Sequence, residues 1–340
     1  MTKAIAPGRV NLIGDHTDYT GGLVLPMAID RFTEIDFQRE GDRVRLSSRD
    51  DPAAVDLPLP VDQPGTVEPG TVEPGTVEPA WGRYIAAVIE QVRPTVGIHG
   101  HVASDIPIGA GLSSSASLEV AAALALGFGG TSRELAELCR RAEHRATGVP
   151  TGIMDQLVIA AGVHGHALLI DCHDLSVQPV AVPDGAEIVV QFVAHRTLVG
   201  SPYAARVAEC TAAEAAIGPL RLATTEQAAS IADPVVRARA MHVVGENKRV
   251  RTCAAALAAG DLSTAGRLMV ESHASLRDLY GCSTAAMDVA VETLCATPGV
   301  YGARMTGGGF GGCVVALTEP AALTTGWVVR PVGGARLIAG

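Results

Sequence analysis

Short runs with the composition of β-strands alternate with longer runs of helical periodicity along most of this chain. A chain with this order of elements packs helices against sheets, so the order predicts a fold of the α+β or α/β class. Strands are expected over residues 34–37, 44–47, 167–171, 187–193 and 313–318. Helices are expected over residues 81–92, 117–126, 132–147, 203–216, 235–259, 262–280 and 284–295.

The length of the chain predicts two domains. It has 340 residues, of which 48% are hydrophobic, enough to build a sizeable core. A boundary is expected near residue 175, which gives domains at residues 1–175 and 176–340. Residues 65–79 are three tandem copies of Gly-Thr-Val-Glu-Pro. Because Pro and Gly recur in every copy, we expect an extended surface loop without a function of its own.

Charge and cysteine content limit the partners and the compartment. The formal net charge is −10, and Lys3 and Lys248 are the only lysines, so a nucleic-acid partner is not expected. The longest apolar stretch, residues 118–128, contains Glu119 and is too short to span a bilayer, so no membrane is expected either. The seven cysteines form no C-x-x-C pair, and the N-terminus lacks a signal-peptide pattern. These features predict a cytoplasmic protein.

The predicted helix 132–147 carries a carboxylate that needs a partner. Thr131 and Glu134 form a capping box at its start, and Gly148 ends it. Glu143 lies beside the apolar stripe of this helix rather than opposite it. Burying an unpaired charge is costly, so its partner is either a metal ion or an arginine.

Residues 107–117 have the features of a phosphate-binding loop. Their sequence is Pro-Ile-Gly-Ala-Gly-Leu-Ser-Ser-Ser-Ala-Ser, and a predicted helix follows directly. The glycines allow close backbone approach, and the helix N-terminus offers free N–H groups and positive potential. A tight turn with a serine cap needs fewer of these residues. The loop is not a Walker A loop, because the chain has no Gly-Lys pair.

A second glycine-rich segment, residues 307–312, formally matches the dinucleotide fingerprint G-x-G-x-x-G. That fingerprint follows a strand and opens a helix, whereas here a predicted strand follows. We therefore reject the dinucleotide interpretation. A loop whose bare backbone lies against a ligand or another loop is expected, with a buried β-bulge as the alternative.

Residues 8–22 combine an arginine with several side chains that can bind hydroxyl groups. Asp15, His16 and Asp18 crowd one turn between glycines. Carboxylates accept several hydrogen bonds each, so the turn could bind sugar hydroxyls, a metal ion or only water. Arg9 precedes an apolar run, and a guanidinium beside a buried strand has an anionic partner. Asp155 follows a Pro/Gly segment at residues 148–153 and is either a structural cap or a functional acid.

Taken together, these segments resemble the galactokinases, within the kinase superfamily named for galactose, homoserine, mevalonate and phosphomevalonate. The resemblance rests on residues 8–22, 107–117, 148–156 and 304–312, with shorter matches at 81–84, 245–250 and 272–276. It implies a two-lobed small-molecule kinase fold. The N-terminal α/β lobe would be similar to the second domain of ribosomal protein S5, and the C-terminal lobe would be ferredoxin-like.

The resemblance also implies an activity and a set of roles. The activity is phosphorylation of galactose at its anomeric hydroxyl, with ATP and Mg²⁺ and with a monomer or weak dimer as the assembly. Asp155 would be the base or orienting carboxylate, and Arg9 would stabilise charge on the phosphoryl group. The remaining implied residues are Asp15, His16, Asp18, Gly152 and Tyr203 for the sugar; Gly109, Ala110, Gly111, Leu112, Ser113, Ser114 and Ser115 for the phosphates; Trp81 and Tyr84 for the adenine; and Ser115 and Glu143 for Mg²⁺.

The chain departs from the family pattern in two places near these residues. Position 15 is aspartate where glutamate is commoner, and Thr151 stands where cysteine is usual. The first change alters a sugar contact, so arabinose and an N-acetylated hexosamine are alternative substrates. A non-catalytic galactose sensor is a further alternative. A metal-binding protein is the third, with its candidate ligands at His164, His166, Asp171, His173 and Asp174.

Overall fold

A six-stranded sheet forms the centre of the N-terminal part of the molecule in a computed structural model that describes residues 2–59, 73–195 and 200–339. The strand order is β13-β1-β3-β6-β4-β5, and all neighbours are antiparallel except β4 and β6. The bounds are β1 (Thr2–Asn11), β3 (Pro26–Arg39), β4 (Arg43–Ser48), β5 (Val55–Pro58), β6 (Ile98–Ser104) and β13 (Arg336–Ile338).

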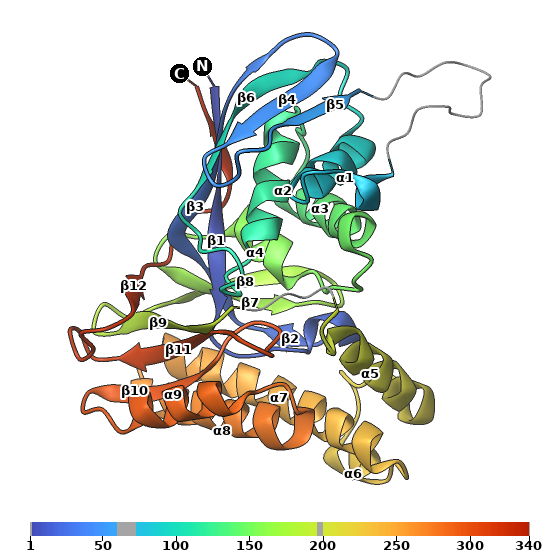
Figure 1. Ribbon diagram of the computed structural model, residues 1–340. Helices are drawn as coiled ribbons and strands as arrows, with labels where there is room; N and C mark the ends of the chain where they lie inside the picture. Colours follow the sequence, from blue (N-terminus) through green and yellow to red (C-terminus); the bar gives the residue numbers. More distant parts are fainter. Residues whose placement is uncertain (1, 60–72, 196–199, 340) are drawn as a thin grey trace.

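Four helices cover one face of this sheet (Figure 1). They are α1 (Gly82–Val92), α2 (Ser114–Ala125), α3 (Ser132–Thr147) and α4 (Met154–Ala161). Helix α2 packs directly against β1 and β3, while α1 and α3 pack against α2. The core between these layers is mostly Ala, Val, Leu and Ile. The packing of α2 on this core holds its N-terminus beside β1.

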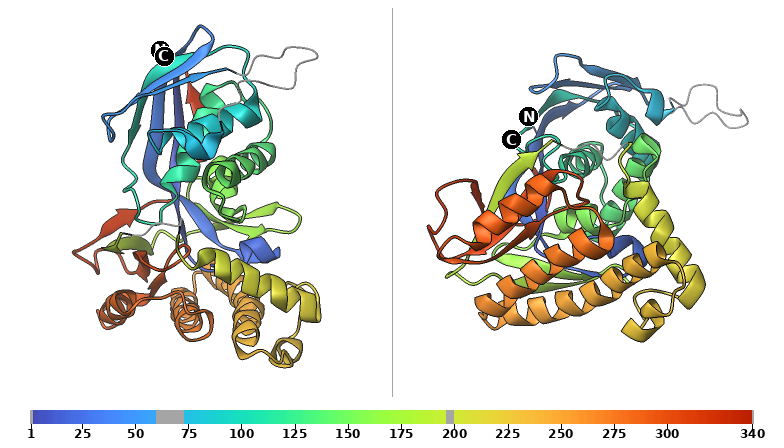
Figure 2. Two further views of the ribbon diagram at one scale, coloured as in Figure 1. Left: turned by 45° about the vertical axis from the view of Figure 1, so that its right-hand side comes forward. Right: turned by 60° about the horizontal axis from the view of Figure 1, so that its bottom comes forward.

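The remainder of the chain builds a second layered unit with helices on one side (Figure 2). Its antiparallel sheet has the order β10-β11-β9-β12, and a small sheet β2-β7-β8 joins the two units. The strands are β2 (Leu23–Val24), β7 (His166–Asp171), β8 (Ser176–Ala181), β9 (Glu187–Ala194), β10 (Val300–Met305), β11 (Gly312–Thr318) and β12 (Trp327–Val329). The helices are α5 (Tyr203–Ile217), α6 (Thr225–Ala229), α7 (Pro234–Ala258), α8 (Leu262–Ser275) and α9 (Ala285–Cys295).

Every strand and helix expected from the sequence is present; α3 has the expected bounds, and the ends of the others are shifted. The capping box of Thr131 and Glu134 starts α3, and Gly148 ends it with a positive φ of 69°, as predicted. The helix expected over residues 262–280 changes at Leu276 into a π-helical turn, η3 (Leu276–Tyr280), which ends at Gly281. The expectations omitted β2, β5, β6, β8, β10, β12, β13, α4 and α6, and gave no bounds for β1.

Strand β13 pairs with β1, so the C-terminal end of the chain lies on the N-terminal sheet, and a boundary at residue 175 stays a prediction. Most of the pentapeptide repeat lies outside the described residues. Its last part forms a 3₁₀ turn, η2 (Pro74–Thr76), and Val77 is buried in the core, so the expected extended surface loop is wrong there. Among the helices of the described ranges, none combines the length and apolarity that crossing a membrane requires.

Candidate active site

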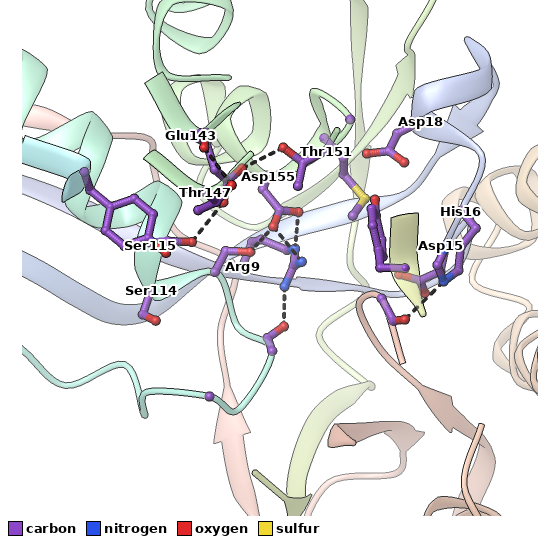
Figure 3. A pocket seen from close by; sticks show the side chains of 18 of the residues that line it. Arg9, Asp15, His16, Asp18, Ser114, Ser115, Glu143, Thr147, Thr151 and Asp155 are labelled. Atoms are coloured by element: carbon purple, nitrogen blue, oxygen red, sulfur yellow. Dashed lines mark hydrogen bonds and ion pairs between the residues drawn. The ribbon is translucent and has the colours of Figure 1, made fainter. Parts of the chain in front are cut away.

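The residues singled out in the sequence converge on a cavity of about 320 Å³, shown from close by in Figure 3. Three loops reach it: the serine-rich loop (residues 107–113), the acidic loop (residues 14–18) and the dividing loop (residues 148–153), which joins α3 to α4. The predicted site residues that line the cavity are Arg9, Asp15, His16, Asp18, Tyr84, Gly109, Gly111, Ser113, Ser114, Ser115, Glu143, Gly152, Asp155 and Tyr203.

Three predicted residues do not line the cavity. Ala110 and Leu112 are buried in the hydrophobic core, so from this part of the loop only backbone faces the cavity. Trp81 packs against the core beneath α1, and its indole N–H donates to the carbonyl of Ala53 at 3.2 Å. The proximity of Trp81 to a bound adenine stays a prediction.

Arg9 and Asp155 form a bidentate ion pair in the middle of the cavity. Arg9 Nε donates to Asp155 Oδ1, and Nη2 donates to Oδ2, both at 2.8 Å. Arg9 Nη1 donates to the carbonyl of Gly111 at 2.5 Å. Arg9 is 2% exposed, whereas the Asp155 side chain is 30% exposed. The guanidinium therefore fixes the carboxylate in one orientation and leaves it accessible from the cavity.

Helix α4 and the serine-rich loop complete the surroundings of Asp155. The sequence placed Asp155 after a Pro/Gly segment, and the structure starts α4 at Met154, so the carboxylate lies in the first turn of a helix. Ser113 donates a short hydrogen bond to Asp155 Oδ2. Ser113 is the N-cap of α2 and has a positive φ of 63°. This left-handed conformation turns the backbone so that the N-terminus of α2 faces the cavity.

Glycine is favoured where the serine-rich loop crosses β1. The backbone N–H of Arg9 donates to the carbonyl of Leu112 at 3.1 Å. A Cβ at Gly8 would lie 3.0 Å from that same carbonyl oxygen. Gly109 and Gly111 have φ values of 73° and 78°. The loop is thus held against β1 in a conformation that presents backbone to the cavity.

Glu143, on α3, lies on the other side of Asp155 from Asp15 and His16 (Figure 3). Its carboxylate accepts hydrogen bonds from Ser115 at 3.1 Å, Thr151 at 2.9 Å and the amide of Gln156 at 2.9 Å. The same amide lies 3.4 Å from Oε2 of Glu119, which is fully buried on α2. The structure describes no arginine or lysine in an ion pair with either glutamate. Of the two partners that the sequence allowed for Glu143, a metal ion or an arginine, the described residues therefore exclude the arginine.

Burial makes this part of the cavity unfavourable for negative charge. It raises the pKa of Glu143, and the nearby Asp155 raises that pKa further. Burial and the charge of Glu143 raise the pKa of Glu119 well above its usual range. A hard divalent cation held by the Ser115 hydroxyl and the Glu143 carboxylate would relieve this repulsion, and oxygen donors are the ligands that Mg²⁺ prefers. The residues present therefore fit a magnesium ion.

The acidic loop is held by the C-terminal half of the chain. Asp15 is 2% exposed, and its Oδ2 lies 2.6 Å from Nη2 of Arg304, which is fully buried on β10. Its Oδ1 accepts a hydrogen bond from the backbone of Gly307 at 3.0 Å. His16 Nε2 lies 3.2 Å from the carbonyl of Gly308. The segment over residues 307–311 therefore lies against another loop, as one of the two sequence interpretations predicted.

Three tyrosines pack around the His16 ring and hold it in place. Its Nδ1 lies 2.9 Å from the hydroxyl of Tyr19, and that hydroxyl makes a short hydrogen bond to the hydroxyl of Tyr280. The Tyr280 hydroxyl also lies 3.1 Å from Cys210 Sγ. Tyr203 stacks at 5.4 Å from the His16 ring. Because His16 has a positive φ of 66°, this packing holds an otherwise unfavourable backbone conformation.

Asp18 and Gly152 are in direct contact. A Cβ built on Gly152 would lie 1.8 Å from Asp18 Oδ2, so no larger residue fits while Asp18 keeps its place. Burial raises the pKa of Asp18 to about 7, with repulsion from Asp155 and Asp15 as further causes. The acidic loop and the dividing loop thus meet at a carboxylate that changes its charge near neutral pH.

The sequence assigned no role to Arg304, Gln156 or Tyr280. Arg304 carried a detectable signal, because an arginine next to an apolar strand needs an anionic partner, the reasoning that singled out Arg9. Gln156 and Tyr280 carried none, since their partners are set by how helices pack. Among the described residues, no three His, Cys, Asp or Glu side chains are arranged to hold a metal ion, including those proposed at residues 164–174.

Comparison with known proteins identifies the family. Residues 3–38 match the galactokinase galactose-binding signature, residues 83–163 the GHMP kinases N terminal domain, and residues 253–324 the GHMP kinases C terminal. The galactokinase of Bos taurus is 44% identical over 339 residues, which covers 93% of this chain and 83% of that protein. The chain belongs to the galactokinase family. The galactokinase of Chloroflexus aggregans is 42% identical and covers 96% of this chain and 88% of its own length.

A solved structure supports the same family. The galactokinase of Lactococcus lactis, crystallised in complex with galactose, is 30% identical and superposes with a TM-score of 0.87 over 98% of this chain and 94% of that chain. This likeness confirms the kinase fold that the sequence predicted, and membership of the galactokinase family makes the chain an ATP-dependent sugar kinase. Thr151, where galactokinases usually have cysteine, uses its hydroxyl to donate to Glu143.

Proposed function

We propose that this protein transfers the γ-phosphoryl group of ATP to the anomeric hydroxyl of galactose and forms galactose 1-phosphate. The observation that carries the proposal is the position of the Arg9–Asp155 pair. It lies between the N-terminus of α2, which suits phosphates, and the acidic loop, which suits hydroxyl groups. Curated galactokinases at 42–44% identity and the galactose complex of a related galactokinase support the choice of sugar.

The sugar would bind in the part of the cavity lined by the acidic loop. Asp18 and His16 would accept or donate hydrogen bonds to its hydroxyls, while Gly152 and Tyr203 would form the walls. Asp15 would contribute less freely than a longer glutamate, because Arg304 and Gly307 already occupy its oxygens. This shorter side chain is the reason to test other sugars beside galactose.

The triphosphate would lie along the serine-rich loop. The backbone of Gly109 and Gly111 and the hydroxyls of Ser113, Ser114 and Ser115 face the cavity, and the N-terminus of α2 adds positive potential. Tyr84 also lines the cavity and would border the nucleotide. Such a site neutralises charge and aligns the reacting atoms, which is most of what phosphoryl transfer requires.

Asp155 would act directly on the reacting hydroxyl. As the sugar oxygen bonds to the γ-phosphorus, the bond between that phosphorus and the bridging oxygen of ADP breaks, and the hydroxyl proton passes to the Asp155 carboxylate. Arg9 would keep that carboxylate aimed at the sugar and would stabilise charge on the phosphoryl group. Ser115 and Glu143 would hold Mg²⁺, which supplies charge neutralisation on the phosphates when bound.

A cytoplasmic location is part of the same proposal. All seven cysteines are free thiols, which suits a reducing compartment. The expected monomer or weak dimer stays a prediction.

A sugar panel tests the proposed function. Purified protein with Mg-ATP would be assayed for ADP release with galactose, arabinose and an N-acetylated hexosamine. Turnover strongest on galactose supports the proposal. Turnover confined to another sugar would keep the chemistry and change the substrate, and ATP binding without any turnover would favour the sensor.

Substitution of Gly152 by alanine should impair sugar use. The new Cβ cannot coexist with the present position of Asp18, so the carboxylate must move. Misplacement of a binding group by about 1 Å can cost 10²-fold, and we expect kcat/KM for the sugar to fall by roughly 10- to 100-fold with little change in the KM for ATP. Gly185→Ala is the matched control, because its Cβ would meet no atom within 4 Å. Equal kinetics for both variants would contradict the contact.

Sugar binding should depend on pH through Asp18. Its pKa of about 7 lies above that of an ordinary aspartate, so the folded protein protonates it more readily than the unfolded chain does. The free energy of unfolding therefore falls as pH rises toward 7 and Asp18 ionises. The ionised carboxylate is nevertheless the better acceptor for sugar hydroxyls. We expect the KM for the sugar to fall as pH rises from about 6 to 8 while the KM for ATP stays level. An Asp18→Asn variant should lose this dependence.

A further inference from the structure

A second cavity lies behind the first and shares a wall with it. Its volume is about 610 Å³, and Asp18, Thr151 and Gly152 line both cavities. Residues 150–153 of the dividing loop separate the two spaces. One face of α3 forms the opposite wall, and the turn between β7 and β8 closes one side. The proposed function uses the first cavity and leaves this one without a role.

The wall formed by α3 is basic in a chain whose net charge is −10. The lining residues of α3 are Arg133, Glu137, Arg140, Arg141 and His144, which recur at helical spacing on one face. Arg133 pairs with Glu137 at 3.3 Å. Arg141 donates to a neutral acceptor, Oε1 of Gln91, at 3.0 Å. His173 lines the cavity from the turn between β7 and β8.

Arg140 is the arginine of this wall that has a buried donor without an acceptor among the described residues. Its Nε is buried, and among the residues that the structure describes no group accepts a hydrogen bond from it. No carboxylate in the described ranges forms an ion pair with it either. A buried guanidinium donor without an acceptor is costly, and the cost is removed when an anion supplies one.

We propose that this second cavity binds a phosphomonoester dianion. Arginine side chains recognise phosphate through paired, charge-assisted hydrogen bonds, and Arg140 and Arg141 are adjacent on the same wall. The volume is within the range of small-molecule sites, so a phosphorylated monosaccharide fits as well as inorganic phosphate. The phosphate group is what the two ligands share, and the remainder of the cavity would contact a sugar ring.

Anion binding in the second cavity would be coupled to sugar binding in the first through the wall that the two cavities share. His144 Nε2 lies 2.9 Å from the carbonyl of Thr151, and the Thr151 hydroxyl donates to Glu143 at 2.9 Å. A bound dianion would also oppose the ionised form of Asp18, which lines both cavities. Sugar and anion would then weaken each other's binding, since such a coupling is reciprocal. This linkage rests on the proposed function, whereas the anion site does not.

Calorimetric titration of the whole protein tests the site. Galactose and a non-hydrolysable ATP analogue with Mg²⁺ would fill the first cavity, and inorganic phosphate or galactose 1-phosphate would then be titrated. We expect saturable binding by the wild type that Arg140→Met weakens by roughly tenfold or more, because one charged hydrogen-bonding group is lost. Tighter binding of galactose 1-phosphate would identify the sugar phosphate as the ligand. No binding of either, or equal binding by Arg140→Met, would overturn the proposal.

Two more variants separate loss of the anion site from misfolding and from a general loss of positive charge. Arg141→Met removes a more exposed charge of the same wall and should weaken phosphate binding even if Arg140→Met folds poorly. Arg267→Met removes an exposed arginine on α8 and should leave binding unchanged. In kinetic assays, phosphate should raise the KM for galactose in the wild type and not in Arg140→Met, and an unchanged KM with phosphate bound would overturn the linkage. Phosphate binding that depends on Arg140 in a protein without sugar kinase activity would contradict the proposed function alone.

Discussion

Asp155→Asn should lower kcat by about 10²- to 10⁴-fold, the usual contribution of a positioned base, and should leave ATP binding nearly unchanged. The amide cannot take up the sugar proton. It also presents an N–H group to Arg9, which now donates to both carboxylate oxygens at 2.8 Å. The orientation of the side chain is therefore lost together with its basicity. Steady-state kinetics with galactose and an equilibrium titration with an ATP analogue would measure the two effects.

The matched control is Asp184→Asn, an exposed aspartate that does not line the cavity. It should retain wild-type turnover. Near-normal kcat in Asp155→Asn would show that positioning by the remaining residues suffices and that Asp155 is not the base. Loss of ATP binding in the same variant would instead point to a collapsed cavity.

Arg304→Met should destabilise the folded protein by roughly 3–5 kcal/mol, the range found when one partner of a buried ion pair is removed. Asp15 would be left 2% exposed with its cation gone. The acidic loop should loosen as a result, so the KM for the sugar should rise along with the loss of stability. Urea unfolding and sugar kinetics would report the two consequences separately.

A double variant sharpens this prediction. Adding Asp15→Asn to Arg304→Met removes the stranded charge, and we expect it to restore much of the lost free energy of unfolding but not the sugar affinity. Arg267→Met is the control, because its pair with Glu271 is exposed and such pairs contribute about 1 kcal/mol or less. If the double variant is no more stable than Arg304→Met alone, the pair is not what holds the loop.

Local patterns predicted the parts of this structure that depend on neighbours in sequence. Thr131 and Glu134 specified the first turn of α3, because a capping box acts within four residues. The serine-rich loop was assigned to the start of a helix for the same reason, and α2 begins at Ser114. The convergence of Arg9, Asp15 and Asp155 on one cavity came from family resemblance, since spacing along the chain contains no such information.

Patterns failed where tertiary contacts decide the outcome. Pro7 and Gly8 break the alternation of β1, and the strand continues there only through a bulge opposite β3. Helix α4 has only eight residues and follows Pro150 and Gly152, so no helix was expected there, and its packing on the core is what stabilises it. The partners of Glu143 and Asp15 could not be derived, because hydrogen bonds to side chains on other elements leave no periodic trace.

The contacts that hold the acidic loop and the end of β1 before it join residues about 290 positions apart in the sequence. Thr306 Oγ1 accepts a hydrogen bond from the backbone of Asn11 at 3.1 Å and donates to its carbonyl at 3.0 Å, across 295 residues. Closing such a long loop costs only modestly more entropy than closing a shorter one. The hydrogen bonds that offset this cost form only after the end of β10 has reached β1. During synthesis, the serine-rich loop and α2 can therefore pack on the N-terminal sheet before Arg304 and residues 306–308, which hold the acidic loop and the end of β1, have been made. The nucleotide half of the cavity would be built early and the sugar half last, so a nascent chain could meet ATP before it can recognise a sugar.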